Sequence, residues 1–157
     1  MDRLPRVLIS ACLAGVPCRY DAKPQAITGL DRLAERCALI PVCPEQLGGL
    51  PTPRTPAEKR GGRVLDRNGR DVTRAFESGA TQAVRIAKLC GADLALLKSR
   101  SPSCGRGLIY DGSFSGRLVP GDGVTAKSLL SIGLPVYTEE ELDALLCDLE
   151  EIRHDKV

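Results

Sequence analysis

The stretch Arg6-Val7-Leu8-Ile9-Ser10 leads through Ala11 into Cys12, and the same pattern recurs twice along the chain. The apolar run 38–42 leads into Cys43, and the run 93–97 leads through a short polar loop into Cys104. Short apolar runs without alternation are typical of strands in a parallel sheet whose two faces are both covered. Since the carboxyl ends of parallel strands lie at one edge, we expect these three thiols to meet where open α/β sheets bind their ligands.

The segments between these runs have helical character. Apolar spacing predicts helices over residues 27–37, 73–90 and 123–132, a short last strand over 135–137, and a final helix with a leucine-rich face. Thr138 and Glu141 form the capping box that opens the final helix. Alternating strands and helices predict an α/β fold, with one domain over residues 1–157 and a Rossmann-like, mostly parallel sheet flanked by helices.

Two regions do not fit this alternation. Residues 44–62 contain four prolines and four glycines, which predicts a long irregular loop, and such loops in compact domains are usually functional. A small β-hairpin insertion is expected where residues 63–66 and 70–72 flank a turn at Asn68-Gly69. A weak strand over 108–110 and a second small hairpin as far as residue 118 are also expected.

Composition excludes several classes of function. Aromatic residues make up 3% of the 157 residues and the net charge is +2, so we expect no large nucleic-acid partner. No apolar stretch is long enough to span a bilayer, and the N-terminus runs directly into a strand, so we expect a cytoplasmic protein without a membrane partner. We also expect a monomer. In that compartment, seven cysteines are more typical of thiols or metal ligands than of disulfides.

The cysteines fall into distinct groups by position. Three of them lie in or beside predicted helices and are expected to be structural: Cys37, Cys90 and Cys147. Cys12, Cys43 and Cys104 each follow a strand, which favours a metal or cluster site with one position open. Cys18 lies in the same loop as Cys12 and is either a fourth ligand or a neighbouring thiol. Two alternatives therefore stay open: a closed four-cysteine zinc or iron–sulfur site without catalysis, and a thiol redox enzyme that uses Cys12 and Cys18.

Three groups of motifs resemble the thiouracil desulfurase family (TudS) in its short, single-domain form. They are Ser10-Ala11-Cys12-Leu13-Ala14-Gly15 with Cys18-Arg19-Tyr20-Asp21, then Pro41-Val42-Cys43-Pro44-Glu45 with Gly48-Gly49-Leu50 and Pro53-Arg54, and finally Lys98 with Ser101-Pro102-Ser103-Cys104-Gly105. The motifs occur in the family's order, and the resemblance extends from the first strand to at least Gly105.

The resemblance implies a 4Fe-4S cluster held by Cys12, Cys43 and Cys104, with one iron open to substrate and with Cys18 outside the ligand set. It implies a non-redox desulfuration in which a thiolated pyrimidine such as 4-thiouracil is hydrolysed to the oxo form and hydrogen sulfide. Some relatives carry a second domain and act on thiolated tRNA. The length of this chain favours a free base or nucleoside, and thus a small-molecule partner.

Hydrolysis requires a base, and Glu45 stands two residues beyond Cys43. The only histidine, His154, is close to the C-terminus, which favours Glu45 as the acid/base group. The resemblance favours Ser101 as a second catalytic residue. The remaining candidates are expected to bind substrate: Ser103 at the pyrimidine edge, Arg19 and Tyr20 over the ring, and Gly48 and Gly49 as backbone donors to a carbonyl oxygen.

Overall fold

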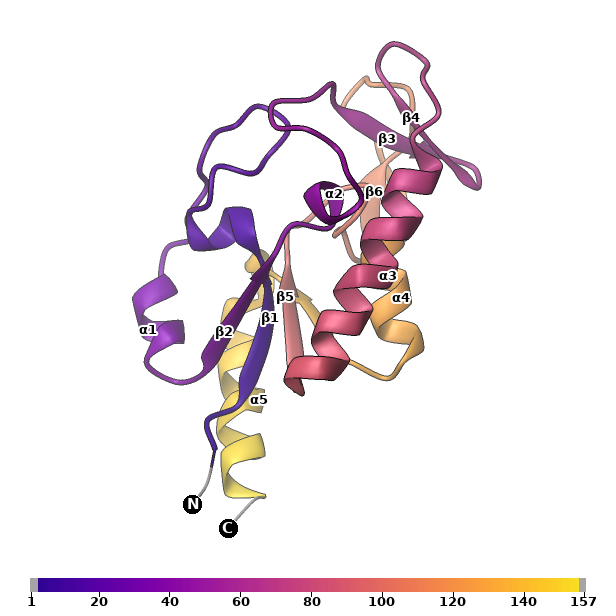
Figure 1. The fold of residues 1–157 in the computed structure, drawn as a ribbon. Coiled ribbons are helices and arrows are strands. Elements are labelled where there is room, and N and C mark those ends of the chain that lie inside the picture. The colour runs from indigo at the N-terminus through magenta and orange to yellow at the C-terminus, as the bar shows by residue number, and fades with distance from the viewer. Residues whose placement is uncertain (1–2, 156–157) are drawn as a thin grey trace.

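The computed structural model describes residues 3–155 and is built around a four-stranded parallel sheet (Figure 1). Its strands are β1 (Arg6–Ser10), β2 (Ala38–Val42), β5 (Leu94–Leu97) and β8 (Val136–Thr138), in the spatial order β2-β1-β5-β8. The three apolar runs thus form adjacent strands, with β1 between the other two. The predicted α/β fold with a parallel sheet is confirmed.

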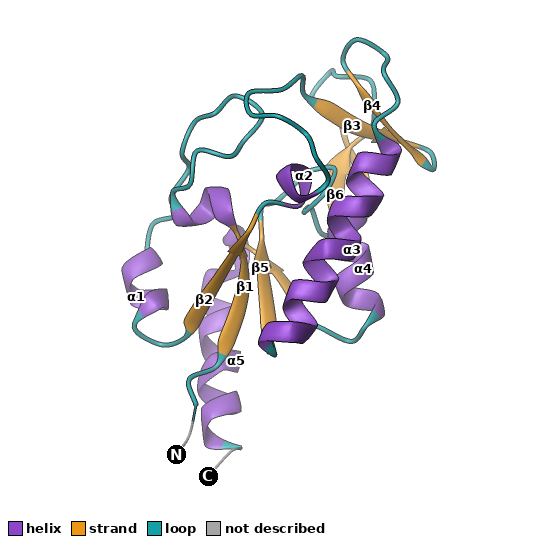
Figure 2. Ribbon diagram, in the orientation of Figure 1, coloured by secondary structure: helices purple, strands orange, loops and turns teal. Residues whose placement is uncertain are grey.

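Helices cover both faces of this sheet (Figure 2). They are η1 (Ala11–Ala14), α1 (Leu30–Ala34), α2 (Pro44–Leu47), α3 (Thr73–Cys90), α4 (Val124–Ser131), η2 (Glu139–Glu141) and α5 (Leu142–His154). Because successive residues of a strand face opposite sides, Val7 and Ile9 pack toward α1 and α5, whereas Leu8 packs toward α3 and α4. The sheet is thus the middle layer between two hydrophobic cores.

The connections diverge at the centre of the sheet. From β1 the chain passes to β2 on one side, and from β5 it passes to β8 on the other. The carboxyl ends of β1 and β5 therefore flank a topological switch point, where the outgoing loops leave space between them.

Two small hairpins extend beyond this edge of the sheet (Figure 1). One consists of β3 (Ala57–Arg60) and β4 (Arg63–Asp66), and the other of β6 (Leu108–Tyr110) and β7 (Leu118–Pro120). The strand expected over 108–110 is β6, but it pairs with β7, so the second hairpin spans 108–120 and does not lie within 112–118 as expected. The expectation of an irregular segment over 44–62 is wrong, because this segment contains both α2 and β3.

The hairpin expected around Asn68-Gly69 is present but short. The N–H of Asp66 donates to the carbonyl of Arg70 and that of Val72 to the carbonyl of Val64, both at 2.9 Å, with an antiparallel bridge between Leu65 and Asp71. β4 pairs in addition with β3, which the sequence did not indicate. Oδ1 of Asp66 accepts the N–H groups of Asn68 and Arg70, both at 2.9 Å, and stabilises the turn.

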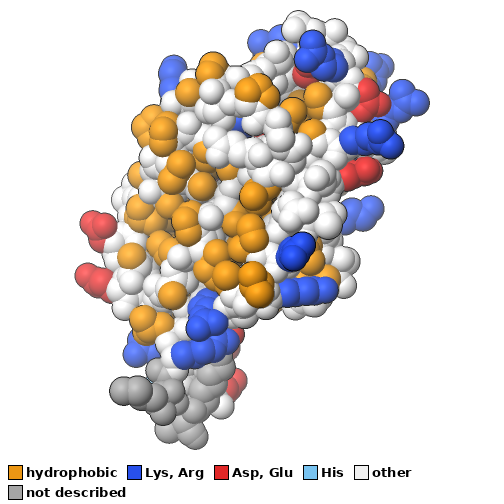
Figure 3. Space-filling model, in the orientation of Figure 1, with side chains coloured by type: hydrophobic (Ala, Val, Ile, Leu, Met, Phe, Trp, Pro, Cys, Tyr) orange, Lys and Arg blue, Asp and Glu red, His pale blue; other side chains and the backbone are white. Residues whose placement is uncertain are grey.

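Two further expectations need correction. The helix predicted over 27–37 is confined to α1, because Gly29 at φ 88° precedes it and the N–H of Ile27 donates to the carbonyl of Leu13 instead. β2 is covered only in part: it is an edge strand with Ala38 and Pro41 exposed, while Leu39 and Ile40 pack against the two cores on its opposite faces. Hydrophobic side chains gather on the β2 side of the molecule (Figure 3). Proline is tolerated at an edge because it has no N–H to leave unpaired.

The other predicted elements lie where expected. The capping box of Thr138 and Glu141 is present and opens η2, which runs into α5. Within residues 3–155, no helix has both the length and the apolar character needed to cross a membrane.

The contact between α2 and α3 depends on two glycines. A Cβ at Gly79, in the middle of α3, would overlap the carbonyl oxygen of Pro44, and one at Gly48 would overlap that of Ala75. The absence of both side chains lets the backbone after Cys43 lie directly on α3. This close approach fixes the position of α2 against the long helix.

We expect Gly79→Ala to lower the free energy of unfolding by about 1–3 kcal/mol because of this overlap. Helix propensity alone predicts the opposite sign, since alanine is better than glycine inside a helix by about 1 kcal/mol. Urea denaturation measures the difference. Gly62→Ala is the matched control, because nothing lies within 4 Å of its added Cβ. A Gly79→Ala protein as stable as the parent would contradict the close packing.

Candidate functional site

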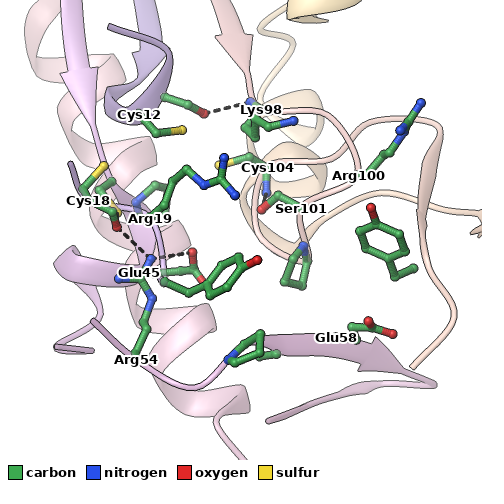
Figure 4. A pocket seen from close by; sticks show the side chains of 18 of the residues that line it. Cys12, Cys18, Arg19, Glu45, Arg54, Glu58, Lys98, Arg100, Ser101 and Cys104 are labelled. Carbon is green, nitrogen blue, oxygen red and sulfur yellow. Dashed lines mark hydrogen bonds and ion pairs between the residues drawn. The ribbon is translucent and has the colours of Figure 1, made fainter. Parts of the chain in front are cut away.

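A cavity of about 490 Å³ opens at the carboxyl edge of the sheet. Ser10, Val42 and Lys98 line its floor, at the ends of β1 and β2 and directly after β5, and Glu58 and Tyr110 of the two hairpins line its far end. Figure 4 shows thiols at one end of this space and Glu58 and Arg100 at the other. The cavity therefore occupies the switch point that the sheet topology defines.

Four thiols line the cavity, and three of them follow the ends of adjacent strands. Cys12 lies in η1 directly after β1, Cys43 follows β2, and Cys104 lies in the loop after β5. All three line the same cavity, and the proximity of Cys43 helps to raise the pKa of Cys12. The structure thus brings together the thiols that the sequence pattern placed at one edge.

Cys18, the fourth thiol, is buried beside Cys43. Its backbone carbonyl accepts a bond from the Cys43 thiol at 3.7 Å and one from Nη2 of Arg54 at 2.9 Å. The loop between η1 and α1 is tied to the site by these contacts, and Cys18 is held there by its backbone.

The loop that carries Cys104 is anchored by the first turn of α4. The N–H of Val124 donates to the carbonyl of Pro102 at 2.9 Å, and that of Thr125 to Ser103 at 2.8 Å. Within the loop, Oγ of Ser101 accepts the N–H groups of Ser103 and Cys104, at 3.1 and 3.0 Å. Helix and serine together fix the orientation of Cys104.

Burial determines the protonation of these thiols. It raises the pKa of Cys12 to about 11, with the neighbouring Cys43 adding to the rise, and it raises the pKa values of Cys18 and Cys104 to about 12. A thiol redox enzyme needs a lowered pKa, so these values disfavour the redox alternative. Thiols of this kind become thiolates when a cation binds them. Clustered soft sulfur donors, with Lys98 and Arg19 nearby, fit an iron–sulfur cluster.

Glu45 lies in the first turn of α2 and forms an ion pair with Arg54 across the cavity wall. Nη2 of Arg54 is 2.9 Å from Oε2 of Glu45, and the two side chains are 5% and 20% exposed. Because the same Nη2 also bonds to the carbonyl of Cys18, one guanidinium links the carboxylate to the loop of the fourth thiol. No donor among residues 3–155 is hydrogen-bonded to Oε1 of Glu45, which leaves this oxygen able to act in the cavity.

A second ion pair fixes the end of β5. Nζ of Lys98 is 2.7 Å from Oε1 of Glu139, and Ser99 donates to the same carboxylate through its N–H and its hydroxyl. Burial raises the pKa of Glu139, but the bonds from Lys98 and Ser99 outweigh it and hold the pKa below its usual value. The start of the Cys104 loop is thereby fastened to η2, directly after the neighbouring strand β8.

Arg19 and Tyr20 both line the cavity. The guanidinium of Arg19 lies over the ring of Tyr20, 5.6 Å from its centroid, and is bonded to Gln25 and Asp21. The two side chains thus lie together on the part of the cavity wall that the loop after η1 forms.

Three other predicted residues do not line the cavity. Gly48 packs on α3, and Gly49 lies in the turn after α2, where φ is 92°. Ser103 is 1% exposed, and its hydroxyl lies 2.9 Å from that of Thr125. These positions serve the packing of the loops that carry Cys43 and Cys104.

The two hairpins supply lining residues that could not be predicted from the sequence. Oε1 of the buried Glu58 accepts the N–H groups of Gly112 and Phe114, each at 3.1 Å, and Arg67 lies 5.5 Å from the centroid of the Phe114 ring. No local pattern marks these residues, because the packing of one hairpin on the other brings them to the site.

The cysteines expected to be structural lie outside the cavity lining. Cys37 is buried and donates to the carbonyl of Leu33 at 3.3 Å, whereas Cys147 is exposed on α5. His154, the last residue of α5, is also exposed. Cys37, Cys147 and His154 therefore lie outside the site at the sheet edge.

Fold and site together define an α/β protein with a thiol-lined cavity at the switch point of a parallel sheet. The chain matches the 2-thiouracil desulfurase family over residues 7–141, and it belongs to that family. A solved structure named 4Fe-4S-dependent thiouracil desulfidase TudS is 42% identical, with a TM-score of 0.89 over 93% of this chain and 98% of that one. The uncharacterized protein YbbK of Bacillus subtilis (strain 168) is 39% identical over 150 residues, which cover 89% of this chain and 99% of YbbK.

We expect Arg54→Leu to lower the free energy of unfolding by about 3 kcal/mol, because it leaves the carboxylate of Glu45 and the carbonyl of Cys18 without their shared donor. Arg32→Leu is the control: its pair with Asp143 is exposed and is worth at most about 1 kcal/mol. Chemical denaturation of both variants measures the contrast. Equal losses would show that the Arg54 pair contributes no more than a surface pair.

Proposed function

We propose that this chain is a 4Fe-4S-dependent desulfidase, with residues 1–157 acting as one domain, that hydrolyses a thiolated pyrimidine to the oxo form and hydrogen sulfide. The observation that carries the proposal is the meeting of three strand-end thiols in one cavity with an ion-paired carboxylate. Family membership and the similarity to a structure named as a thiouracil desulfidase support it. The substrate is a small molecule, a 4-thiouracil-like base or nucleoside.

Cys12, Cys43 and Cys104 are the residues that would hold the cluster, with Cys18 outside the ligand set. When bound, the cluster supplies an iron without a protein ligand, a soft Lewis acid that polarises a thiocarbonyl. A closed zinc site would need Cys18 as a fourth ligand beside these three thiols.

Glu45 acts as the acid/base group. Its carboxylate accepts a proton from the water that attacks the ring carbon, and it then delivers that proton as the sulfur leaves. The Arg54 guanidinium at 2.9 Å holds the carboxylate in place. The overall change is C=S plus water to C=O plus hydrogen sulfide, so no electrons are gained or lost.

Ser101 donates a hydrogen bond into the cavity. Because its Oγ already accepts two backbone N–H groups, its hydroxyl proton is directed away from the loop and toward the space where substrate would lie. Arg19 and Tyr20 cover that space from the other side. Ser103, Gly48 and Gly49 have no direct role here, because they do not line the cavity.

The decisive experiment is anaerobic reconstitution followed by an assay with 4-thiouracil and 4-thiouridine. We expect the broad visible absorption of a 4Fe-4S cluster, four irons per chain, and stoichiometric release of sulfide and the oxo-pyrimidine. A protein with an intact cluster that releases no sulfide from either compound would overturn the substrate assignment.

Glu45→Gln and Ser101→Ala should keep the cluster and lower kcat, by about 10²–10⁴-fold for the general acid/base. Asp143→Asn, on the exposed side of α5, is the control and should keep parental turnover. Cluster absorption is compared with sulfide release in each variant. Parental kcat in Glu45→Gln would remove this residue from the mechanism.

Cys18→Ser separates the open site from the closed one. We expect this variant to retain the cluster, whereas Cys12→Ser should lose it, because only Cys12 is a ligand in the proposal. Iron and zinc content of protein purified without oxygen gives the answer. Equal loss of metal in the two variants would favour the closed four-cysteine site.

A further inference from the structure

The sheet face that carries Leu8 is covered by α3 and α4, but the cover is incomplete at the edge strand β2. By the alternation of a strand, Ala38 and Ile40 share this face, and Ala38 is exposed while Ile40 is half-buried. From α3, Ile86 packs half-buried against the same core, and Leu89 in the last turn is 81% exposed. Ala38, Ile40, Ile86 and Leu89 thus define an apolar surface, the β2–α3 face (Figure 3).

Acidic side chains border this face on the side of α1 (Figure 3). Arg32 and Arg36 pair with carboxylates of α5, on the other side of the molecule from α3. Asp31 and Glu35 each precede one of these arginines by one position, about 100° around the helix, and so face away from the pairs with α5. Both are exposed, and within residues 3–155 neither forms an ion pair.

Basic side chains border the same face on the side of α3. Arg85 and Lys88 lie in the last two turns of this helix, next to Leu89, and both are exposed. Neither forms an ion pair with any residue that the structure describes. Figure 3 shows Lys and Arg side chains over this part of α3 and acidic side chains at the opposite edge, over α1. The apolar surface therefore lies between two flanks of opposite charge.

This distribution of charge matches a second copy of the same chain. In an isologous dimer, a twofold axis places one surface patch against itself. With the axis in the plane of the contact and parallel to the strands, the α1 flank of each protomer meets the α3 flank of its partner. A partner of uniform charge gains at one flank what it loses at the other. An apolar centre with a charged rim is also the usual composition of a protein interface.

We propose that the β2–α3 face is the interface of a twofold-symmetric homodimer, in which Asp31 and Glu35 of one protomer pair with Arg85 and Lys88 of its partner. The contact also protects the edge strand β2, whose outer side is open in a single chain. None of these four residues lines the cavity, so both cavities stay accessible and the inference is independent of the proposed function. It departs from the monomer expected from the sequence, because periodicity does not show how far a helix covers the sheet.

The first test is the oligomeric state of the full chain, measured by sedimentation velocity at rising protein concentration. We expect a dimer that dissociates as salt is added, because exposed charges are screened. Leu89→Asp should weaken the dimer at least about 10-fold, since it places a charge at the apolar centre. Leu108→Asp is the matched control: Leu108 is 47% exposed on the β6–β7 hairpin, outside this face, and its variant should dimerise like the parent.

The second test reverses the flanks. The double variant Asp31→Lys with Glu35→Lys makes both flanks basic, and Arg85→Glu with Lys88→Glu makes both acidic. Each double variant alone should be monomeric at concentrations where the parent is a dimer, because like charges then meet twice. An equimolar mixture of the two should form a heterodimer, because opposite charges meet again at both flanks. This reciprocal rescue is specific to self-association through the two flanks.

A parent chain that stays monomeric up to about 0.1 mM, well above the dissociation constants of stable dimers, would overturn the inference. A dimer that persists unchanged in Leu89→Asp and in both double variants would overturn it as well, by placing the interface elsewhere. Circular dichroism establishes that each variant folds. If the double variants do not fold, the contrast between Leu89→Asp and Leu108→Asp decides, and equal association of these two contradicts the proposed interface.

Discussion

The parallel register of β1 between β2 and β5 is the constraint on which the site depends. Ser10 pairs with Val42, and Ile9 pairs with Leu96, so the three strands end at nearly the same level. Because a cysteine closely follows β1 and β2, and another lies in the loop after β5, this register brings three thiols from distant parts of the chain to one edge. A shift of register would separate these thiols and would also turn core side chains to the wrong face.

Electrostatics in the cavity follow from its burial. Sulfur atoms removed from water resist ionisation, as the raised pKa values of Cys12 and Cys104 indicate, and a bound cationic centre reverses that preference. The chain places its own charges around them in fixed pairs, Arg54 with Glu45 and Lys98 with Glu139. Each pair also fastens a loop, so the same contacts that balance charge hold the cavity in shape.

Helices and strands could be predicted where the sequence signal is local and strong. Helix α3 has the predicted bounds, since a 3.6-residue apolar period runs up to Gly91, which ends the helix at φ 62°. The turn after β4 was predicted at the right residues, and the carboxylate of Asp66 stabilises it by accepting two turn amides. β3 was missed, because its pairing with β4 is not visible in its own short polar sequence. Likewise, the sequence suggested that the N–H of Gly48 donates to a substrate carbonyl, but the structure shows that its missing side chain allows the close contact with α3.

The four strands of the parallel sheet, the cysteines that follow three of them and the family resemblance could be predicted, because each is encoded in contiguous residues. The meeting of polar groups from separate elements could not be predicted: Arg54 links Glu45 to the Cys18 loop, and Glu58 accepts amides from the tip of the second hairpin. The physical reason is range. Periodicity and turn chemistry act over a few residues, whereas a buried hydrogen bond depends on where separate elements pack.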